Sequence, residues 1–397
     1  MRPVHPFPAR MAPDTVAHWL KALPVGARVL DPMCGSGVVV RQSVLLGHRA
    51  KGFDIDPLAV LMSKVWTRKG NHAALYGAAD KVIGRVERIG QFSHLQLPWI
   101  AKCPETIKFI EYWFSEPQRS DLARLACEIE RLRGQDDGWL CDALQLALSR
   151  IIITKHAGAS LAWDVSHSRP HRKRDENDFD VYGGFRKAVT RLAGLLDDEV
   201  LPRSGTVRIG DCRKLSTVKR GSVDAVVTSP PYLNAIDYLR GHKFSLVWMG
   251  HSIPELRDIR SGSMGTERAG SRSESEEAAT LERAVPSIRS LPPRQRAIVH
   301  KYARDAGHMI REMQRVLSPG GLMVLVLGDS NLRGIPVYNS KIFKHISVES
   351  GFLLEEERKR PLQNDRRYLP IASASAALAK RMKVEVLQAY RLLASSA

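Results

Sequence analysis

Three aspartates, Asp31, Asp54 and Asp211, each stand at or just after the end of a short apolar run that has the character of a buried β-strand. The carboxyl ends of parallel strands meet at one edge of an open sheet, and ligands bind at that edge. A single strand-end acid is more often part of a simple turn. Three of them predicted at one edge favour a ligand site, and their charge suits a nucleoside with a positively charged tail.

Two close glycines, Gly35 and Gly37, separate Asp31 from a predicted helix and allow the backbone to approach a ligand. Their spacing is not that of the dinucleotide motif G-x-G-x-x-G, and no lysine follows to complete a phosphate-binding loop. The turn therefore favours a ligand without a pyrophosphate.

The elements that position these residues form two alternating α/β segments. In the first, helix, strand, helix and strand are predicted over 13–23, 28–32, 37–47 and 49–57. In the second, strands are predicted over 205–212, 223–232 and 322–330, with a helix over 302–317. Strands that are apolar along their whole length are typical of a parallel sheet covered on both faces. We predict an α/β fold with a mainly parallel, twisted sheet.

The chain divides into five predicted regions. Residues 1–69 hold the first α/β segment, and residues 70–204 are a mostly helical insertion that ends in a basic stretch. Residues 205–250 contain the stretch VVTSPPYLNAIDY, in which a buried strand stops at two prolines. Residues 251–300 are rich in Arg, Ser and Gly, which predicts a flexible loop. Residues 301–397 complete the α/β part.

Four motifs, DPMCGSG, GFDID, GDCRKL and TSPPY, occur in this order, and HPFPARM at 5–11 precedes them. Together they resemble the motifs of the S-adenosylmethionine-dependent DNA methyltransferases that modify exocyclic amino groups, namely cytosine N4 or adenine N6. The resemblance covers both α/β segments but neither the insertion nor the Arg/Ser-rich loop. It implies a Rossmann-like class I methyltransferase fold, S-adenosyl-L-methionine as the cofactor and double-stranded DNA as the substrate.

The resemblance also implies roles for single residues. Asp54 would hold the cofactor ribose, with Asp56 as a second candidate, and Asp211 would face the adenine amino group. The 5–11 segment would close over the methionine part. The whole set implied to bind the cofactor is Phe7, Pro8, Asp31, Pro32, Cys34, Gly35, Gly37, Asp54, Asp56, Asp211 and Cys212. The catalytic loop would be Ser229, Pro230, Pro231 and Tyr232.

The chemistry of amine methylation explains why such a loop has these residues. An exocyclic amine is a poor nucleophile because its lone pair is delocalised into the base. Hydrogen bonds from the amine to a serine oxygen and a backbone carbonyl favour a tetrahedral, nucleophilic geometry. Prolines make the loop rigid, and a tyrosine ring can stack on a base that has been flipped out of the duplex.

The serine at position 229 indicates the target base. Relatives with serine before Pro-Pro-Tyr mostly modify cytosine N4, whereas those with Asp or Asn mostly modify adenine N6, so we favour cytosine N4. The alternatives are an adenine N6 enzyme, an RNA base methyltransferase and a catalytically silent DNA-binding protein on the same fold. A cytosine C5 enzyme is disfavoured because its nucleophilic cysteine follows a proline, and no Pro-Cys pair occurs here.

The charge of the chain points to nucleic acid. Sixty Lys and Arg residues against 42 Asp and Glu residues give a formal charge of +18. In the basic stretch of the insertion, phosphate contacts are predicted for Arg169, Arg172, Lys173 and Arg174, although a solvated surface is an equally good interpretation. The Arg/Ser-rich loop is the rival site for base readout. A cognate restriction endonuclease is a possible partner, and the oligomeric state stays open.

The remaining features are compatible with this interpretation. No apolar run approaches the roughly 20 residues that cross a bilayer, and prolines interrupt the amino terminus, so we expect a cytoplasmic protein without membrane contact. The five cysteines are widely spaced, which predicts reduced thiols. No His, Asp or Glu set suggests a metal. His242 is either structural or a phosphate partner.

Overall fold

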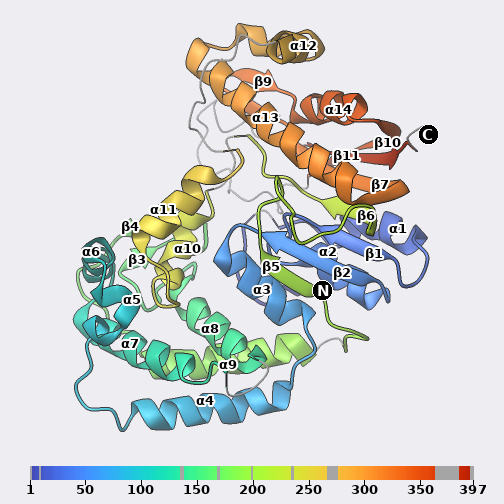
Figure 1. The fold of residues 1–397 in the computed structure, drawn as a ribbon. Helices are drawn as coiled ribbons and strands as arrows, with labels where there is room; N and C mark the ends of the chain where they lie inside the picture. The colour runs from blue at the N-terminus through green and yellow to red at the C-terminus, as the bar shows by residue number, and fades with distance from the viewer. Residues whose placement is uncertain are drawn as a thin grey trace.

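A seven-stranded, mostly parallel sheet forms the centre of the molecule in the computed structural model (Figure 1). The structure describes residues 2–8, 10–134, 138–167, 170–197, 200–233, 237–265, 276–362 and 384–393. The strand order is β5-β2-β1-β6-β7-β11-β10, and only β11 runs against its neighbours. The strands are β1 (Arg28–Asp31), β2 (Arg49–Asp54), β5 (Thr206–Ile209), β6 (Val223–Thr228), β7 (Leu317–Gly328), β10 (Phe352–Pro361) and β11 (Val384–Leu392). The predicted Rossmann-like α/β fold is confirmed.

Both faces of the sheet are buried, as the apolar strands predict. Along β7, Met323, Leu325 and Leu327 belong to the cluster that holds the apolar face of α13 (Pro293–Val316). The alternate residues Leu322, Val324 and Val326 pack with α1 (Asp14–Ala22) in a second cluster. Helices α2 (Val38–Leu45), α3 (Pro57–Thr67) and α14 (Asn339–Glu349) complete the cover, and a small hairpin is formed by β8 (Ser330–Leu332) and β9 (Ile335–Val337).

The strand order reverses direction at β1. From β1 the chain continues to β2 and β5 on one side, and it then returns to place β6 on the other side of β1. The register pairs Val29 with Ala225 and Leu30 with Val226, so β1 and β6 end close to each other. The crevice at such a reversal is where open α/β sheets bind ligands.

The insertion forms a helical lobe beside the sheet, at the lower left of Figure 1. It shares one hydrophobic cluster with α3, in which Leu58, Met62 and Trp66 pack with Leu144 and Leu148. The lobe is therefore built onto the α/β part. Its elements are α4 (His72–Val86), η1 (His94–Gln96), α5 (Pro98–Ala101), α6 (Pro104–Trp113), α7 (Glu116–Glu130), α8 (Trp139–Ile152), β3 (Ala162–Trp163), η2 (Val165–His167), β4 (His171–Arg172) and α9 (Val181–Asp197).

The region 251–300, predicted as a flexible loop, contains helices on both sides of residues 266–275, which lie outside the described part. After α10 (Leu239–Leu246) come α11 (Ile253–Gly262), α12 (Glu276–Ala284), η3 (Pro286–Ser290) and the start of α13. A capping box begins α11, since the Ser252 hydroxyl accepts from the N–H of Glu255 while the Glu255 carboxylate accepts from the N–H of Ser252. This S-x-x-E pattern was readable in the sequence, but the high Arg and Ser content masked it.

All five cysteines are free, as predicted. Among the described residues, no helix is both long and apolar enough to cross a membrane.

The Gly37→Ala substitution should destabilise the protein strongly. Gly37 has φ of +90°, and a Cβ there would overlap Ser63 Oγ and lie 3.0 Å from Ser63 Cα. The left-handed backbone adds about 1–2 kcal/mol of strain, and the overlap adds about 1–3 kcal/mol. Chemical denaturation should therefore show a larger loss of unfolding free energy for Gly37→Ala than for Gly26→Ala. Gly26 has φ of +84°, but no atom lies within 4 Å of a Cβ built there. Equal losses of unfolding free energy in the two variants would show that Ser63 can move aside without destabilising the protein.

Candidate active site

One buried side-chain hydrogen bond joins the ends of β1 and β6. Thr228 Oγ1 donates to Asp31 Oδ1 over 2.8 Å, and both side chains are buried. The backbone N–H of Met33 donates to the same oxygen over 3.2 Å. Asp31 thus connects two segments. The glycine turn follows it directly in the chain, and its hydrogen bond to Thr228 links it to Ser229, the next residue after β6.

The glycine turn is held against the end of β2. The N–H of Gly35 donates to Asp54 Oδ2 over 2.8 Å, and the N–H of Cys34 donates to the carbonyl of Phe53, also over 2.8 Å. Gly35 has φ of +50°, and a Cβ there would lie 3.2 Å from the ring of Phe7. The turn, Asp54 and Phe7 therefore lie close together, and the positive φ with the nearby ring favours glycine at position 35.

Of the two strand-end carboxylates, Asp31 is buried and Asp54 is partly buried, and in the described part of the chain neither has a cation beside it. Burial, and to a lesser degree the charge of Asp54, raise the pKa of Asp31 to about 7. Burial and the charge of Asp56 raise the pKa of Asp54 to about 6. Among the described residues, neither carboxylate forms an ion pair. A pair of this kind favours a bound group that brings positive charge or hydrogen-bond donors.

Asp56 has a structural role in addition to any contact with a ligand. Its Oδ1 accepts from the N–H of Leu58 over 2.9 Å and caps α3. Its Oδ2 lies 2.5 Å from Nδ1 of His242, which is only 1% exposed. Both oxygens of Asp56, like those of Asp54, thus have partners within the protein, and His242 faces a carboxylate.

The amino-terminal segment lies over the turn. The ring of Phe7 stacks on that of Tyr238, with 4.8 Å between centroids, and Pro8 is buried. His5 Nε2 lies 2.8 Å from Ser149 Oγ of α8, and burial lowers the pKa of His5 to about 3. A neutral, buried His5 therefore fixes the segment to the insertion lobe.

Asp211 lies at the same sheet edge but is engaged by a neighbour. Arg213 donates to both carboxylate oxygens, with Nε 2.9 Å from Oδ1 and Nη2 2.6 Å from Oδ2, and also donates to Asp305 over 2.9 Å. Burial acts to raise the pKa of Asp211, but the hydrogen bonds and charge of Arg213 lower it. The sequence predicted that Asp211 faces the adenine amino group, but it did not predict that Arg213 pairs with this carboxylate.

Cys34 and Cys212 are buried beside these acids, and Pro32 is buried with them. Burial raises the pKa of both thiols, so both stay protonated near neutral pH. A protonated, buried thiol is a poor nucleophile, in agreement with the disfavoured C5 chemistry.

The Ser-Pro-Pro-Tyr loop is fixed by hydrogen bonds from three neighbouring elements. Ser229 Oγ donates to the carbonyl of Val326 in β7 over 3.0 Å. The hydroxyl of Tyr302 in α13 donates to the carbonyl of Pro231 over 3.0 Å. The Tyr232 hydroxyl lies 3.5 Å from Glu385 Oε1 of β11. Within the described residues, nothing donates to the carbonyl of Pro230.

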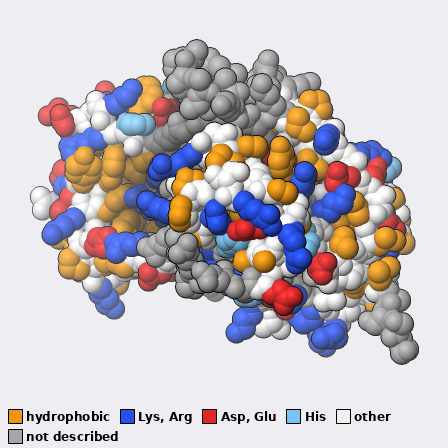
Figure 2. Space-filling view, turned by 90° about the horizontal axis from the view of Figure 1, so that it is seen from above, with side chains coloured by type: hydrophobic (Ala, Val, Ile, Leu, Met, Phe, Trp, Pro, Cys, Tyr) orange, Lys and Arg blue, Asp and Glu red, His pale blue; other side chains and the backbone are white. Residues whose placement is uncertain are grey.

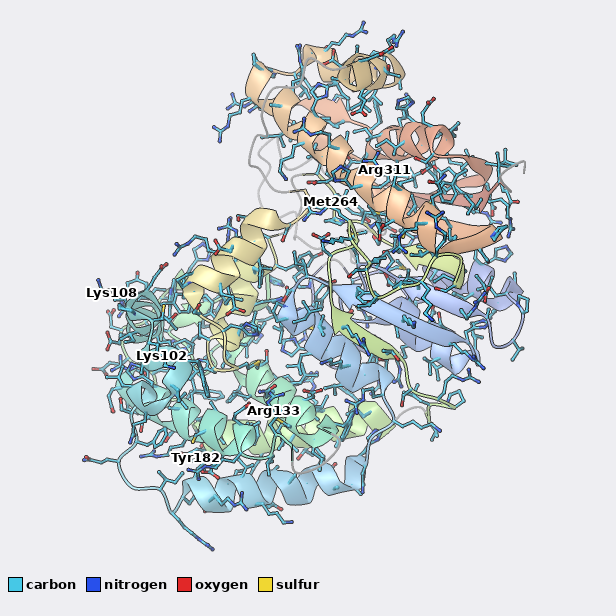
Figure 3. The ribbon with its side chains drawn as sticks, viewed as in Figure 1. Lys102, Lys108, Arg133, Tyr182, Met264 and Arg311 are labelled. Atoms are coloured by element: carbon cyan, nitrogen blue, oxygen red, sulfur yellow. The ribbon has the colours of Figure 1, made fainter. Side chains whose placement is uncertain are left out.

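A further segment closes against this loop. Met264, between α11 and α13 in Figure 3, is buried in the cluster of α13. A Cβ at the next residue, Gly265, would lie 3.2 Å from the carbonyl oxygen of Tyr232. The chain that leaves α11 thus borders the loop.

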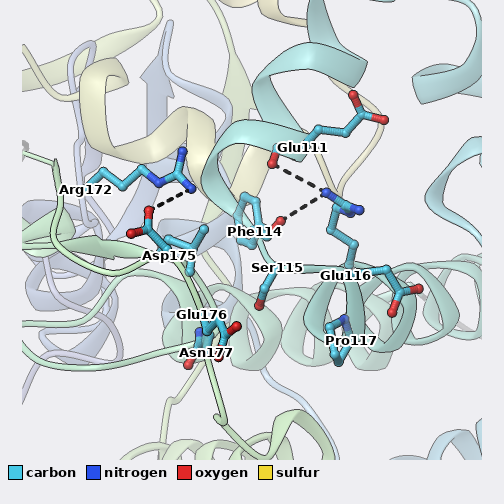
Figure 4. Close-up of a pocket in the computed structure, with 11 residues that line it drawn as sticks. Glu111, Phe114, Ser115, Glu116, Pro117, Arg172, Asp175, Glu176 and Asn177 are labelled. Atoms are coloured by element: carbon cyan, nitrogen blue, oxygen red, sulfur yellow. Dashed lines mark hydrogen bonds and ion pairs between the residues drawn. The ribbon is translucent and has the colours of Figure 1, made fainter.

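The predicted basic stretch lies in the insertion lobe. Arg172 pairs with Asp175 over 3.3 Å and lies over the ring of Tyr112, while Lys173 lies over Trp163. Arg172 also lines a pocket of about 460 Å³ whose other charged residues include Glu111, Glu116, Arg119, Asp175 and Glu176 (Figure 4). Among described residues, Nε and Nη2 of the half-buried Arg174 lack a hydrogen-bond partner. Arg169 lies outside the described part.

Three side chains at this edge were missed from the sequence, namely Arg213, Tyr302 and Glu385, and His242 was considered only as a structural residue or a phosphate partner. Arg213 was within reach of sequence reasoning because it stands two residues after Asp211 in GDCRKL. His242 meets Asp56 across 186 positions, a separation that no local pattern reveals.

The strand-edge geometry defines a Rossmann-like α/β protein whose candidate ligand site lies where the sheet reverses. No family model matches the chain. It is similar to the type II methyltransferase M.AvaI of Nostoc sp., with 24% identity over 376 residues that cover 83% of this chain and 74% of the relative. It is also similar to the type II methyltransferase M.BsoBI of Geobacillus stearothermophilus, with 22% identity over 264 residues, 59% of this chain and 49% of the relative.

Two solved structures are matched at lower identity. A SAM-dependent methyltransferase of Methanosarcina mazei has 9% identity and a TM-score of 0.34, over 96% of this chain and 97% of its own. A putative DNA modification methylase of Thermus thermophilus has 17% identity and a TM-score of 0.25, over 47% of this chain and 54% of its own.

The raised pKa of Asp31 predicts a pH-dependent stability. The pKa of Asp31 rises from 3.8 to about 7 on folding. The contribution of Asp31 to the free energy of unfolding is therefore complete below about pH 4 and is lost as the pH rises toward 7. The unfolding free energy of the wild type, relative to Asp31→Asn, should fall by up to about 1.4 kcal/mol per pH unit in that window. Denaturation at several pH values measures it.

Asp224→Asn is the control for this prediction. Asp224 has a lowered pKa, chiefly through its hydrogen bonds with Arg28, so its contribution is complete above its ordinary pKa and is lost only as the pH falls. A difference between wild type and Asp31→Asn that stays flat from pH 4 to 7 would contradict an elevated pKa in the folded protein.

Proposed function

We propose that this protein is a DNA methyltransferase that transfers a methyl group from S-adenosyl-L-methionine to N4 of cytosine in duplex DNA. The similarity to type II methyltransferases over most of the chain supports the coarser part of the proposal, methylation of DNA. The choice of cytosine N4 over adenine N6 rests on Ser229, by the resemblance of its motif.

One observation carries the proposal most directly. The hydroxyl of Ser229 donates to the carbonyl of Val326 over 3.0 Å, so Oγ offers lone pairs to other groups, of which the Tyr232 hydroxyl lies 3.5 Å away. The Pro230 carbonyl is a second acceptor without a donor among the described residues. An exocyclic amine has two N–H donors, and this pair of acceptors fits them.

The residues on the other side of Asp31 fit the cofactor. Gly35 and Gly37 let the turn pack closely against Phe7 and Ser63, and Asp54 offers carboxylate oxygens for ribose hydroxyls. Two carboxylates without an ion-pair partner suit a ligand that carries a sulfonium and an ammonium group. When bound, the cofactor supplies an electrophilic methyl group.

The chain itself then has three tasks. Ser229 and the Pro230 carbonyl accept hydrogen bonds from the amine and so direct its lone pair toward the methyl group of the cofactor. Tyr232 offers a ring for the flipped base, and the contact of its hydroxyl with Glu385 fixes the ring's orientation. The Thr228–Asp31 hydrogen bond sets the distance between the two half-sites, since correct positioning supplies much of the acceleration.

Duplex DNA as the partner rests on charge and similarity. The formal charge is +18, and Figure 2 shows Lys and Arg side chains spread among hydrophobic ones on the face seen from above. A cognate restriction endonuclease belongs to the same proposal, because the relatives are named type II methyltransferases.

Incubation of the protein with labelled S-adenosyl-L-methionine and either DNA or RNA tests the proposal. Label should appear in DNA as N4-methylcytosine, and base-resolution mapping should place it in one short sequence. N6-methyladenine would move the target to adenine, and label in RNA alone would overturn a DNA substrate. Binding to DNA without any transfer would support a catalytically silent protein.

Ser229→Ala should lower turnover by about 10²- to 10³-fold, the loss typical when one transition-state hydrogen bond is removed. Binding of S-adenosylhomocysteine, measured by calorimetry, should change little because the serine acts on the base. The matched control is Ser318→Ala, since Ser318 Oγ donates to the Val223 carbonyl over 3.1 Å at the opposite end of the same two strands. Unchanged turnover in Ser229→Ala would remove the serine from the mechanism.

Replacement of Arg169, Arg172, Lys173 and Arg174 by Ala should weaken DNA binding and flatten its dependence on salt. Each lost phosphate contact lowers the slope of log K against log[salt] by about 0.9. Fluorescence anisotropy at several salt concentrations measures this slope. Lys21→Ala in α1, on the opposite side of Figure 1, controls for the loss of a positive charge. An unchanged slope in the fourfold variant would identify the stretch as solvated surface.

A further inference from the structure

A histidine outside every motif belongs to the surroundings of the candidate cofactor site. His242 comes from α10, which follows the catalytic loop, and its side chain is 1% exposed. Its Nδ1 lies 2.5 Å from Asp56 Oδ2. Its Nε2 is buried and has no hydrogen-bond partner among the described residues. A buried polar atom without a partner costs free energy, so such an atom in a candidate site points to a ligand.

The contact with Asp56 assigns the roles of the two ring nitrogens. We take Nδ1 as the protonated nitrogen, since it then donates to Asp56 Oδ2 at 2.5 Å and an ionised carboxylate only accepts. In the neutral ring, Nε2 then presents a lone pair and acts as an acceptor. The capping bond from Leu58 to Asp56 Oδ1 holds the carboxylate in place. The orientation of the imidazole is therefore fixed from α3.

The surroundings of the ring connect it to the residues that border the candidate site. Its centroid lies 5.8 Å from that of Phe7, the residue that faces Gly35. Asp56 is linked to Asp54 by a hydrogen bond from its own N–H, 3.0 Å long. Asp54 in turn receives the N–H of Gly35. His242, Asp54 and the glycine turn thus form a continuous set of neighbours, and Asp54 is the residue expected to hold the ribose.

We propose that His242 is a cofactor-contacting residue whose Nε2 accepts a hydrogen bond from a ribose hydroxyl of the bound nucleoside. The inference rests on the proposed function, since it assumes that the nucleoside cofactor occupies this site. A ribose hydroxyl supplies the hydrogen-bond donor that Nε2 lacks, while Nδ1 of the same ring faces Asp56. Asp54 and His242 would then hold the same sugar from β2 and from α10.

His242→Asn is the main variant for the test. The Asn amide nitrogen can take the place of Nδ1 and still donate to Asp56, so the buried carboxylate keeps a partner while Nε2 is removed. His242→Gln, whose longer amide can reach the place of Nε2 and offer its oxygen as an acceptor, should restore part of the binding. His251→Asn is the matched control, because His251 also pairs with a carboxylate, Glu255 Oε1 at 2.9 Å, but at the surface. Thermal melting without ligand confirms that each variant is folded.

Calorimetry with S-adenosylhomocysteine, adenosine and 2′,3′-dideoxyadenosine distinguishes the parts of the ligand. His242→Asn should lower the affinity for S-adenosylhomocysteine and for adenosine by about the same factor. A loss of about five- to tenfold is typical when one hydrogen bond is removed. Its affinity for dideoxyadenosine should equal that of the wild type. His251→Asn should bind all three ligands like the wild type.

Three results would overturn the inference. Equal affinities of wild type and His242→Asn for every ligand would make His242 purely structural. A loss for S-adenosylhomocysteine alone would place the contact at the amino-acid end. A loss of equal size for dideoxyadenosine would mean that no hydroxyl is involved. Failure of the wild type to bind S-adenosylhomocysteine would instead count against the proposed function, which keeps the two failures apart.

Discussion

The hydrogen bond from Thr228 to Asp31 is the contact on which the geometry of the site depends. It joins the ends of two parallel strands that belong to different segments of the chain and meet where the sheet reverses. On one side of it lies the glycine turn, and on the other lies the loop that begins at Ser229. Because the pair is buried, its hydrogen bond is not exchanged with water, and the two half-sites keep a constant separation.

The helical lobe contributes to this site although it lies beside the sheet. It shares a hydrophobic cluster with α3, the helix capped by Asp56. It also holds the amino-terminal segment, since His5 meets Ser149 of α8, and Ser149 Oγ donates to Ser245 of α10 over 2.9 Å. Phe7 therefore depends on the lobe for its position over Gly35.

The sequence predicted the parts of the site that depend on local pattern. Strand-end acids such as Asp31 and Asp54 follow from apolar runs that stop at turn residues, and the alternation of helix and strand places them at one edge. Contacts between distant segments were out of reach. Arg213 engages Asp305 across 92 positions, and Glu385 reaches Tyr232 across 153. Composition also misled, because the capped helix α11 stands in a region whose Arg and Ser content resembles a loop.

The direction of one hydrogen bond decides what the Ser-Pro-Pro-Tyr loop can do. In the proposed reaction, a serine that donated into the site would compete with the amine, which must itself donate. The carbonyl of Val326 removes that competition, because it takes the hydroxyl proton and turns Oγ into an acceptor. Val326 lies in β7, which is buried on both faces and paired on both edges, so this carbonyl cannot move away easily. The same rigid strand therefore fixes both the position of the serine and the role of its Oγ as a hydrogen-bond acceptor.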